Sequence, residues 1–255
     1  MSNSFKPFGF APQLEKLIEA NGFPSPTPIQ MKAIPLVRQG YDLLAAAQTG
    51  TGKTAAFVLP MLQKMIEETT LYQKRVPRVL VLTPTRELAA QVGETILSLG
   101  KDLGVRSAVV FGGVGINPQK AAIAKGRLLD LMNQGFAGLS KTHILILDEA
   151  DRMLDMGFLP DLKRILKALP PDRQTLLFSA TFSPEIKKLA SEFLNKPESV
   201  EIERNKDSSL VRQTLYRVPK ANKHTVLRDL IVDNQWDQVL VFTRTKYGAD
   251  KLVRH

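Results

Sequence analysis

The residues best suited to chemistry in this 255-residue chain form one glycine-rich turn. It reads Ala47-Gln48-Thr49-Gly50-Thr51-Gly52-Lys53-Thr54 and lies between a short apolar run and a helical pattern. Successive backbone N–H groups and a helix N-terminus offer a cradle for polyanionic phosphate. Lys53 can reach the outer phosphates, and the Thr54 hydroxyl can ligate Mg²⁺. An accidental glycine-rich turn is the alternative, and the strand–turn–helix context disfavours it.

An acidic cluster supplies the second candidate site. The apolar run His143–Leu147 leads directly into Asp148-Glu149-Ala150-Asp151. In nucleotide triphosphatases such a strand end holds the metal ion and the attacking water, so Asp148 would bind Mg²⁺ and Glu149 would orient or deprotonate the water. Acidic residues after a strand more often complement a helix dipole. Together with the phosphate loop, however, the cluster favours the catalytic interpretation.

Alternating apolar runs and helical patterns must position these residues. The strand candidates are Leu43–Ala46, Val79–Leu82, Ala108–Phe111, Ile144–Leu147, Thr175–Phe178 and Val200–Ile202. The helix candidates include Pro12–Asn21, Thr54–Glu68, Arg86–Gly100 and Leu162–Leu169. Near-continuous apolar character indicates strands that are covered on both faces. The alternation therefore predicts an α/β fold, in which helices flank a parallel sheet.

Composition excludes several classes of protein. Hydrophobic residues are 44% and charged residues 24% of the chain, which is ordinary for a globular protein. Cysteine is absent, which excludes disulfides and zinc-thiolate sites. No apolar run approaches the ~20 residues of a membrane span, and the N-terminus lacks a signal-peptide pattern, so we expect a cytoplasmic location. The net charge of +10 fits either a nucleic-acid partner or a plain solvated surface.

The composition changes after Ile202 and suggests a domain boundary. We expect a first domain over residues 1–203, a polar linker over 204–210 and an incomplete second domain over 211–255. The last part should contain a strand, a helix, a strand and the start of a helix, over Val211–Val218, Lys223–Val232, Val239–Phe242 and Tyr247–His255. About 45 residues are too few for an independent core, so they look like the beginning of a second α/β domain.

Several ordered motifs together carry a family resemblance over nearly the whole chain. They are D-E-A-D at Asp148–Asp151, PTRELAAQ at Pro84–Gln91, Gly112-Gly113, Ser179-Ala180-Thr181, the segment from Gly22-Phe23 to Gln30, and VLVFTRTK at Val239–Lys246. The chain resembles the DEAD-box ATP-dependent RNA helicases, with the greatest similarity to the bacterial RhlE type. The resemblance implies a RecA-like fold, ATP and Mg²⁺ as ligands, and RNA bound through its backbone.

The resemblance also implies roles for single residues. Adenine would be read by a motif over residues 3–31, through Phe5, Phe23 and Gln30. RNA would be contacted by Pro84, Thr85, Arg86, Gly112, Gly113, Arg127, Thr243 and Arg244. Ser179 and Thr181 would couple hydrolysis to strand separation. The residues alone leave alternatives open, namely that Gln30 caps local backbone, Phe5 anchors the core, Arg86 forms a surface salt bridge and Ser179 and Thr181 make a strand-end turn.

Two departures from the family pattern qualify this prediction. Where the family has a strand ending in Thr-Pro-Gly-Arg, this chain keeps only Gly126 and Arg127. Its composition predicts one helix from Pro118 to about Asn133. The second domain lacks its remaining motifs, including the arginines that complete the ATP site. We expect an ATP-dependent RNA helicase by family. The alternative is a truncated or degenerate paralogue that only binds ATP and RNA. The ordered RNA-helicase motifs disfavour a third possibility, an ATPase that acts on proteins or DNA.

Overall fold

The computed structural model describes residues 4–68, 77–110, 138–202, 212 and 214–253. The chain divides into two compact units, Met1–Arg204 and Asn205–His255. Each unit is described by itself. Among the residues that the structure describes, no helix is both long and apolar enough to cross a membrane.

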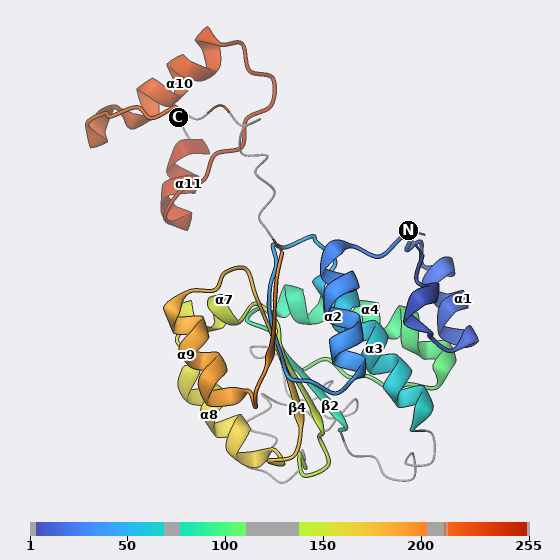
Figure 1. Ribbon diagram of the computed structural model, residues 1–255. Coiled ribbons are helices and arrows are strands. Elements are labelled where there is room, and N and C mark those ends of the chain that lie inside the picture. The colour runs from blue at the N-terminus through green and yellow to red at the C-terminus, as the bar shows by residue number, and fades with distance from the viewer. Residues whose placement is uncertain (1–3, 69–76, 111–137, 203–211, 213, 254–255) are drawn as a thin grey trace. The chain divides into compact units, whose positions relative to one another are not determined.

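A parallel sheet forms the centre of the larger unit (Figure 1). Its strands are β1 (Leu43–Ala46), β2 (Val79–Leu82), β3 (Ile144–Leu147), β4 (Gln174–Ser179) and β5 (Glu198–Glu201), in the order β2-β3-β4-β1-β5. β1, β2 and β3 have the bounds predicted from the sequence, and β4 and β5 differ from theirs by one or two residues. The prediction of a parallel α/β sheet is confirmed.

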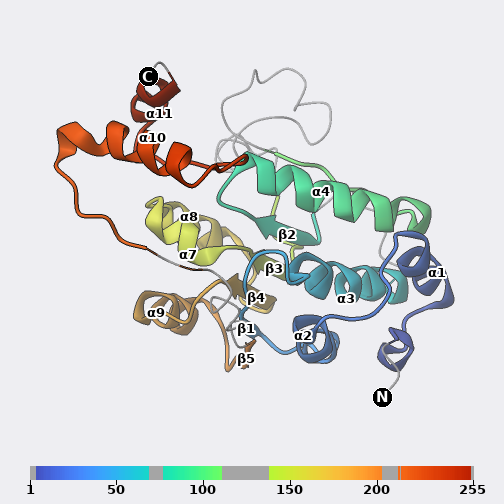
Figure 2. The same ribbon diagram turned by 90° about the horizontal axis from the view of Figure 1, so that it is seen from above.

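Helices cover both faces of this sheet, as Figure 2 shows from above. One face carries η1 (Lys6–Phe8), α1 (Pro12–Ala20), α2 (Pro28–Arg38), α3 (Lys53–Glu67), α4 (Arg86–Gly100) and η3 (Lys101–Leu103). The other face carries α7 (Ala150–Asp155), α8 (Leu159–Ala168) and α9 (Pro184–Phe193). α4 begins where predicted because Thr85 caps it, its hydroxyl accepting a hydrogen bond from Leu88 N at 3.2 Å.

Alternate strand residues enter two separate cores. Ile144 and Ile146 of β3 pack with helices α1 to α4, whereas Leu145 and Leu147 pack with helices α7 to α9. All residues of β1, β3 and β4 are buried, which explains why β1, β3 and the centre of β4 are apolar without alternation. The outer strands β2 and β5 are more exposed.

The predicted strand at Ala108–Phe111 is wrong over Ala108–Val110, which form no strand. Val109 instead packs beside α4, where its Cγ2 would lie 2.3 Å from a Cβ placed on Gly93. A short apolar run indicates burial, but a strand also requires a neighbouring strand, and this run gives no information on one. Phe111, the candidate residues Gly112, Gly113 and Arg127, and the helix predicted from Pro118 lie outside the described residues.

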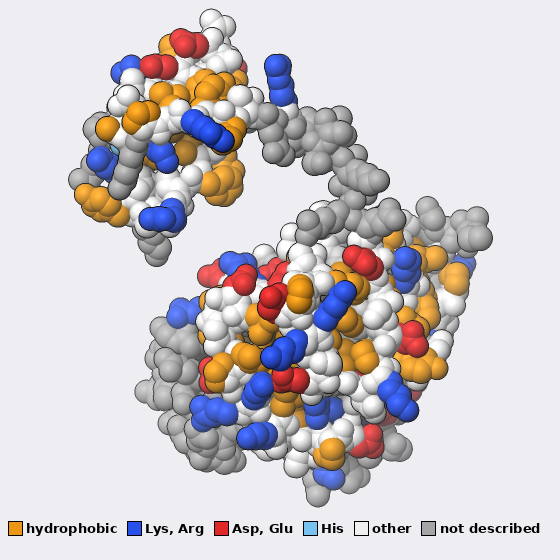
Figure 3. All heavy atoms as spheres, turned by 60° about the vertical axis from the view of Figure 1, so that its left-hand side comes forward, with side chains coloured by type: hydrophobic (Ala, Val, Ile, Leu, Met, Phe, Trp, Pro, Cys, Tyr) orange, Lys and Arg blue, Asp and Glu red, His pale blue; other side chains and the backbone are white. Residues whose placement is uncertain are grey.

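In the smaller unit only the helical predictions hold. It contains η5 (Lys220–Asn222), α10 (Lys223–Asp233) and α11 (Lys246–Val253). The strands predicted at Val211–Val218 and Val239–Phe242 are wrong, because the described residues of both segments form no strand. Leu240 and Phe242 are 80% and 87% exposed, and apolar side chains lie open on this unit's surface in Figure 3. The apolar composition of these segments is typical of buried strands. Their described residues, however, pair with no neighbouring strand and are not covered by other elements.

Candidate functional site

The carboxyl ends of four parallel strands bring the predicted motifs to one edge of the sheet. The loop after β1 is tied to the end of β4, because Ala47 N donates to Ser179 O at 3.0 Å. β3 is tied to β2 where Asp148 N donates to Leu82 O at 3.0 Å. Ligands of open α/β sheets bind at this edge. Motifs that are far apart in the sequence therefore share one face of the larger unit.

The glycine-rich loop has a backbone that glycine permits. Gly50 and Gly52 have φ angles of 79° and 90°, in the left-handed region. The Thr51 hydroxyl donates to Gln48 O at 2.7 Å, and α3 begins directly afterwards at Lys53. Gln48, Thr49 and Gly50 are exposed. The N-terminus of α3 thus follows an open turn whose backbone N–H groups suit a bound anion.

Lys53 lies buried at the start of α3, with 6% of its surface exposed. Its Nζ has no hydrogen-bond partner in the part of the chain that the structure describes. A buried ammonium group without a partner is unfavourable. Thr54, the next residue, is partly buried on the same helical turn. The Lys53 side chain therefore fits an anionic ligand that is not part of the protein.

Asp148 is the buried carboxylate of this edge, only 2% exposed. One oxygen, Oδ1, accepts a hydrogen bond from Glu149 N at 3.0 Å. The pKa of Asp148 is raised to about 6, chiefly by burial and in smaller part by the charges of Glu149 and Asp151, while the charge of Lys53 and the hydrogen bond from Glu149 N act in the opposite direction. Asp148, Glu149 and Asp151 thus place three carboxylates at this edge near the buried Lys53, an arrangement that suits a bound cation.

Glu149 has the one strained backbone of the described D-E-A-D residues. Its φ of 55° is in the left-handed region, which is rare for a residue with a side chain. It lies at the N-cap of α7, and its Oε2 is 3.5 Å from Arg152 Nη1. This conformation turns the chain sharply between Asp148 at the end of β3 and the helix. Strain of this kind is often found at functional sites.

The last acidic residue of the cluster connects it to the Ser179-Ala180-Thr181 turn. Asp151 Oδ2 accepts a hydrogen bond from Ala180 N at 3.1 Å. Within the turn, Ser179 is fully buried and its hydroxyl accepts from Thr181 N at 3.3 Å. The strand-end turn that the residues alone suggested is therefore present. Its coupling role stays a prediction.

Gln30 makes a contact that the sequence did not predict. It is 2% exposed, its Oε1 accepts from Thr27 N at 3.0 Å, and its Nε2 donates to Gly52 O at 3.1 Å. The amide thus caps local backbone and also binds the phosphate loop. Because a side-chain amide has two N–H groups and an oxygen with two lone pairs, one N–H and one lone pair are left over. Reading of adenine by Gln30 stays a prediction.

The aromatic residues of the N-terminal motif form a cluster. Phe5 is 6% exposed and lies 5.9 Å from the Phe8 ring and 6.4 Å from the Phe23 ring, between ring centroids. The interplanar angle with Phe23 is 82°, an edge-to-face arrangement. Phe5 therefore anchors the core in this structure. A direct contact between Phe5 or Phe23 and adenine stays a prediction.

The predicted RNA-contacting residues divide between the two units. Pro84 is buried, Thr85 caps α4, and Arg86 is exposed without an ion pair to any described residue, so the salt-bridge alternative gains no support there. In the smaller unit, the Thr243 hydroxyl donates to Thr245 O at 2.9 Å and Arg244 is exposed. Contact of these residues with RNA stays a prediction.

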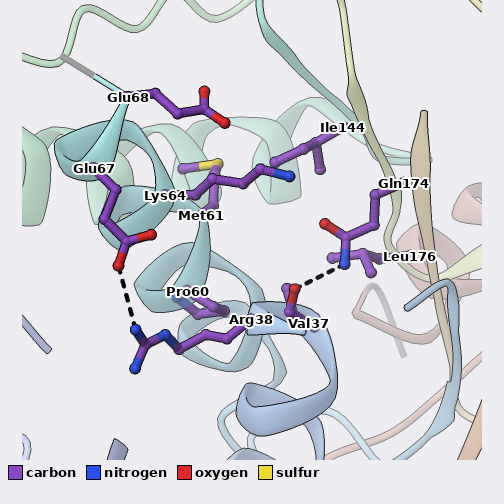
Figure 4. A pocket seen from close by; sticks show the side chains of 10 residues that line it. All are labelled: Val37, Arg38, Pro60, Met61, Lys64, Glu67, Glu68, Ile144, Gln174 and Leu176. Carbon is purple, nitrogen blue, oxygen red and sulfur yellow. Dashed lines mark hydrogen bonds and ion pairs between the residues drawn. The ribbon is translucent and has the colours of Figure 1, made fainter. Parts of the chain in front are cut away.

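A pocket of about 140 Å³ lies away from these motifs, at the amino ends of β3 and β4 (Figure 4). It is bounded by α2 and α3, and Lys64 and Gln174 point into it. Burial lowers the pKa of Lys64, and the nearby Arg78 charge lowers it further. None of the predicted site residues lines this pocket.

Comparison with known proteins identifies the family. The model of the DEAD/DEAH box helicase family matches residues 27–189. The chain is 42% identical to the ATP-dependent RNA helicase CshA of Limosilactobacillus reuteri, covering 97% of this chain and 51% of that protein. It is 38% identical to the ATP-dependent RNA helicase RhlB of Pseudomonas putida, covering 98% and 68%. A special similarity to RhlE stays a prediction.

A solved structure agrees with this assignment. The crystal structure of a DEAD box protein from the hyperthermophile Methanococcus jannaschii matches with a TM-score of 0.71 and 34% identity, over 98% of this chain and 69% of that one. The chain spans about half the length of the first curated relatives it matches. The fold is RecA-like, as the family resemblance implied. With its motifs at one sheet edge, its relatives and its fold in agreement, this chain belongs to the DEAD/DEAH box helicase family.

Proposed function

We propose that the chain binds ATP with Mg²⁺ at the carboxyl edge of its sheet, as part of an ATP-dependent RNA helicase. The observation that carries this proposal is Lys53, a buried ammonium group without a hydrogen-bond partner in the described residues. It follows an open glycine-rich loop and lies close enough to the buried Asp148 for its charge to lower that residue's pKa. An outer phosphate would neutralise the charge of Lys53, and a cation would neutralise the charge of Asp148.

The residues of this edge fit the two ligands. Lys53 would bind the outer phosphates, and backbone N–H groups of the loop from Ala47 to Thr54 would surround them. Mg²⁺ in nucleotide sites takes one or two protein oxygens and completes its coordination with phosphate oxygens and water. The Thr54 hydroxyl and the Asp148 carboxylate suit that pattern. The described residues contain no cluster of three His, Cys, Asp or Glu side chains that would hold a metal alone.

Glu149 is the proposed general base. Its backbone conformation sets the carboxylate at the junction of β3 and α7, where it can orient a water molecule and accept its proton. The bound Mg²⁺ would neutralise phosphate charge. Asp151 holds the Ser179-Ala180-Thr181 turn through Ala180 N, which gives this turn a direct connection to the catalytic carboxylates. We infer that hydrolysis is communicated to RNA through this turn.

RNA would bind through its sugar-phosphate backbone. Thr85 and Arg86 follow β2 at the same sheet edge, and Arg86 is exposed. The net charge of +10 favours polyanion binding without sequence preference. Gly112, Gly113, Arg127, Thr243 and Arg244 complete the proposed set. A cytoplasmic location belongs to the same proposal.

A second candidate function is binding of ATP and RNA with little turnover. The smaller unit favours it, because its segment Val239–Phe242 forms no strand and leaves Leu240 and Phe242 exposed. In phosphoryl transfer an arginine that stabilises the departing phosphate contributes about 10³–10⁵ in rate, and none of the residues proposed here for the nucleotide site is an arginine. We expect this chain to bind ATP far better than it hydrolyses it.

The test compares the unsubstituted chain with Lys53→Ala and the control Lys167→Ala, an exposed lysine on α8. Calorimetry with ATP and Mg²⁺ measures binding, RNA-stimulated phosphate release measures hydrolysis, and a short duplex measures unwinding. RNA-stimulated release supports the helicase, whereas ATP binding without release supports the second function. Failure of the unsubstituted chain to bind ATP, or equal affinity in Lys53→Ala, would contradict both.

A further inference from the structure

The N-terminal segment Phe5–Ala11 makes a tight turn that presents two backbone carbonyls to one side chain. η1 ends at Gly9, whose φ of 59° is left-handed, and Gly9 N donates back to Lys6 O. Phe8 O and Gly9 O both accept hydrogen bonds from the guanidinium of Arg38. Arg38 Nη1 donates to Phe8 O and also to Gly9 O, the latter at 3.2 Å.

Arg38 lies at the last turn of α2 and makes two more contacts. Its guanidinium carbon is 5.8 Å from the centroid of the Phe10 ring, within range of a cation–π interaction. Its Nη2 lies 3.3 Å from Glu67 Oε1 on α3, the contact drawn as a dashed line in Figure 4. Glu67 is 53% exposed, so this ion pair by itself contributes little.

Gln63 closes a ring of polar contacts from the other side. Its Oε1 accepts a hydrogen bond from Ala11 N at 2.7 Å, and its Nε2 donates to Glu67 Oε1 at 2.8 Å. Glu67 Oε1 thus accepts from both Arg38 and Gln63. We name Arg38, Gln63 and Glu67 the N-terminal clasp. It holds the segment on both sides of Gly9, at Phe8 and at Ala11.

The clasp connects this segment to the two helices that carry the proposed nucleotide site. α2 has Gln30 in its first turn and Arg38 in its last, while α3 has Lys53 at its start and Gln63 and Glu67 near its end. From the clasped turn, the Phe8 ring packs on Phe5 and Phe5 packs on Phe23. The position of the aromatic cluster is therefore fixed relative to both helices.

We propose that the N-terminal clasp positions the aromatic cluster for binding of the nucleotide base, with Arg38 as its central positioning residue. The proposal rests on the proposed function, because it assigns Phe5 and Phe23 to the base end of the ATP site. Arg38 itself does not touch the phosphate loop in any contact of the described residues. Its loss should affect recognition of the base and leave recognition of the phosphates unchanged.

The experiment compares ATP with inorganic tripolyphosphate, a ligand that has phosphates but no base. Calorimetry with Mg²⁺ gives the Kd of each for the full chain, for Arg38→Met and Arg38→Lys, and for the control Arg164→Met. Arg164 is an exposed arginine on α8, 3.8 Å from Asp161. Hydrogen exchange at the Gly9 amide reports directly on the clasped turn.

We expect Arg38→Met to weaken ATP binding about tenfold, because it loses charged hydrogen bonds to two carbonyls, with tripolyphosphate binding unchanged within about twofold. Arg38→Lys keeps the charge and one donor direction but not the planar fork, so an intermediate loss is expected. Exchange at Gly9 should accelerate in the same order. Arg38→Lys also carries the test if Arg38→Met fails to fold.

Three results would overturn the proposal. Equal weakening of ATP and tripolyphosphate would make Arg38 a general structural residue. Unchanged ATP affinity in both variants would mean that the clasp does not position the base site. If the unsubstituted chain bound ATP and tripolyphosphate equally well, the protein would not bind the base at all, and the base-binding part of the proposed function would be wrong. This result is distinguishable from failure of the clasp, because it is already seen without any substitution.

Discussion

At the scale of single residues, the charge of Asp148 has opposite effects on stability and on binding. Burial raises its pKa from 3.8 to about 6, so in the ligand-free protein the ionised form is disfavoured. Its contribution to the free energy of unfolding is most favourable below about pH 4 and falls as the pH rises to about 6. Above that pH the buried charge lowers stability by about 3 kcal/mol, since one pKa unit is about 1.4 kcal/mol.

Asp148→Asn should therefore be more stable than the unsubstituted chain at pH 7.5, by up to about 3 kcal/mol. The difference should shrink between pH 6 and pH 4 and disappear below. Urea unfolding of both proteins from pH 4 to 8, without nucleotide, measures it. The same variant should lose Mg²⁺-dependent ATP binding. A stability difference that is independent of pH would contradict the assigned cause.

Two substitutions at Glu149 test its left-handed backbone and its side-chain charge independently. Glu149→Gln keeps the strain, so we expect unchanged stability, retained ATP binding and at least a hundredfold loss of any RNA-stimulated hydrolysis. Glu149→Gly should stabilise the protein by about 1 kcal/mol. Lys196, with φ 45°, is the matched control, because Lys196→Gly should give a similar gain in unfolding free energy without loss of hydrolysis. Equal hydrolysis in Glu149→Gln would exclude the general base.

At the scale of elements, the contact between α2 and the phosphate loop explains the need for a glycine at position 52. A Cβ on Gly52 would lie 2.4 Å from Gln30 Nε2, and φ is 90°. Gly40 has nearly the same φ, 88°, with nothing within 4 Å of its Cβ position. Both Gly→Ala variants should lose about 1 kcal/mol to backbone strain.

Gly52→Ala should lose stability and ATP affinity beyond Gly40→Ala, because the methyl group displaces Gln30 from the loop. Thermal unfolding and calorimetry with ATP measure the two effects. Adding Gln30→Ala to Gly52→Ala should recover part of the stability, since the clash is removed. Identical behaviour of the two Gly→Ala variants would show that backbone strain alone is responsible.

The sequence predicted those elements that are determined by neighbouring residues, and it failed for those that depend on segments far away in the chain. β1, β2, β3 and α4 were predicted to the residue, because apolar runs and helical patterns are read from neighbouring positions. The strand at Ala108–Phe111 and that at Val239–Phe242 were wrong over their described residues, because strand pairing depends on distant segments. The Gln30–Gly52 bond could not be predicted for the same reason.

At the scale of the whole molecule, the proposed nucleotide residues all belong to Met1–Arg204. A chain ending at residue 204 should therefore keep the ATP affinity of the full chain within about twofold. Calorimetry of the two chains measures this. RNA binding should weaken, because the 205–255 unit carries Thr243, Arg244 and an excess of basic residues. A large loss of ATP affinity would mean that the smaller unit takes part in the nucleotide site.

The bond between Asp151 and the Ser179-Ala180-Thr181 turn has a consequence for mutational scanning and for natural variation. Its donor is the backbone N–H of Ala180, which every residue except proline supplies. Side-chain replacement at position 180 leaves this bond in place, so a scan there would underestimate its importance. Only the acceptor, the Asp151 carboxylate, depends on which side chain is present. Variation among functional descendants of this chain should therefore be restricted at Asp151 more strongly than at Ala180, apart from the exclusion of proline.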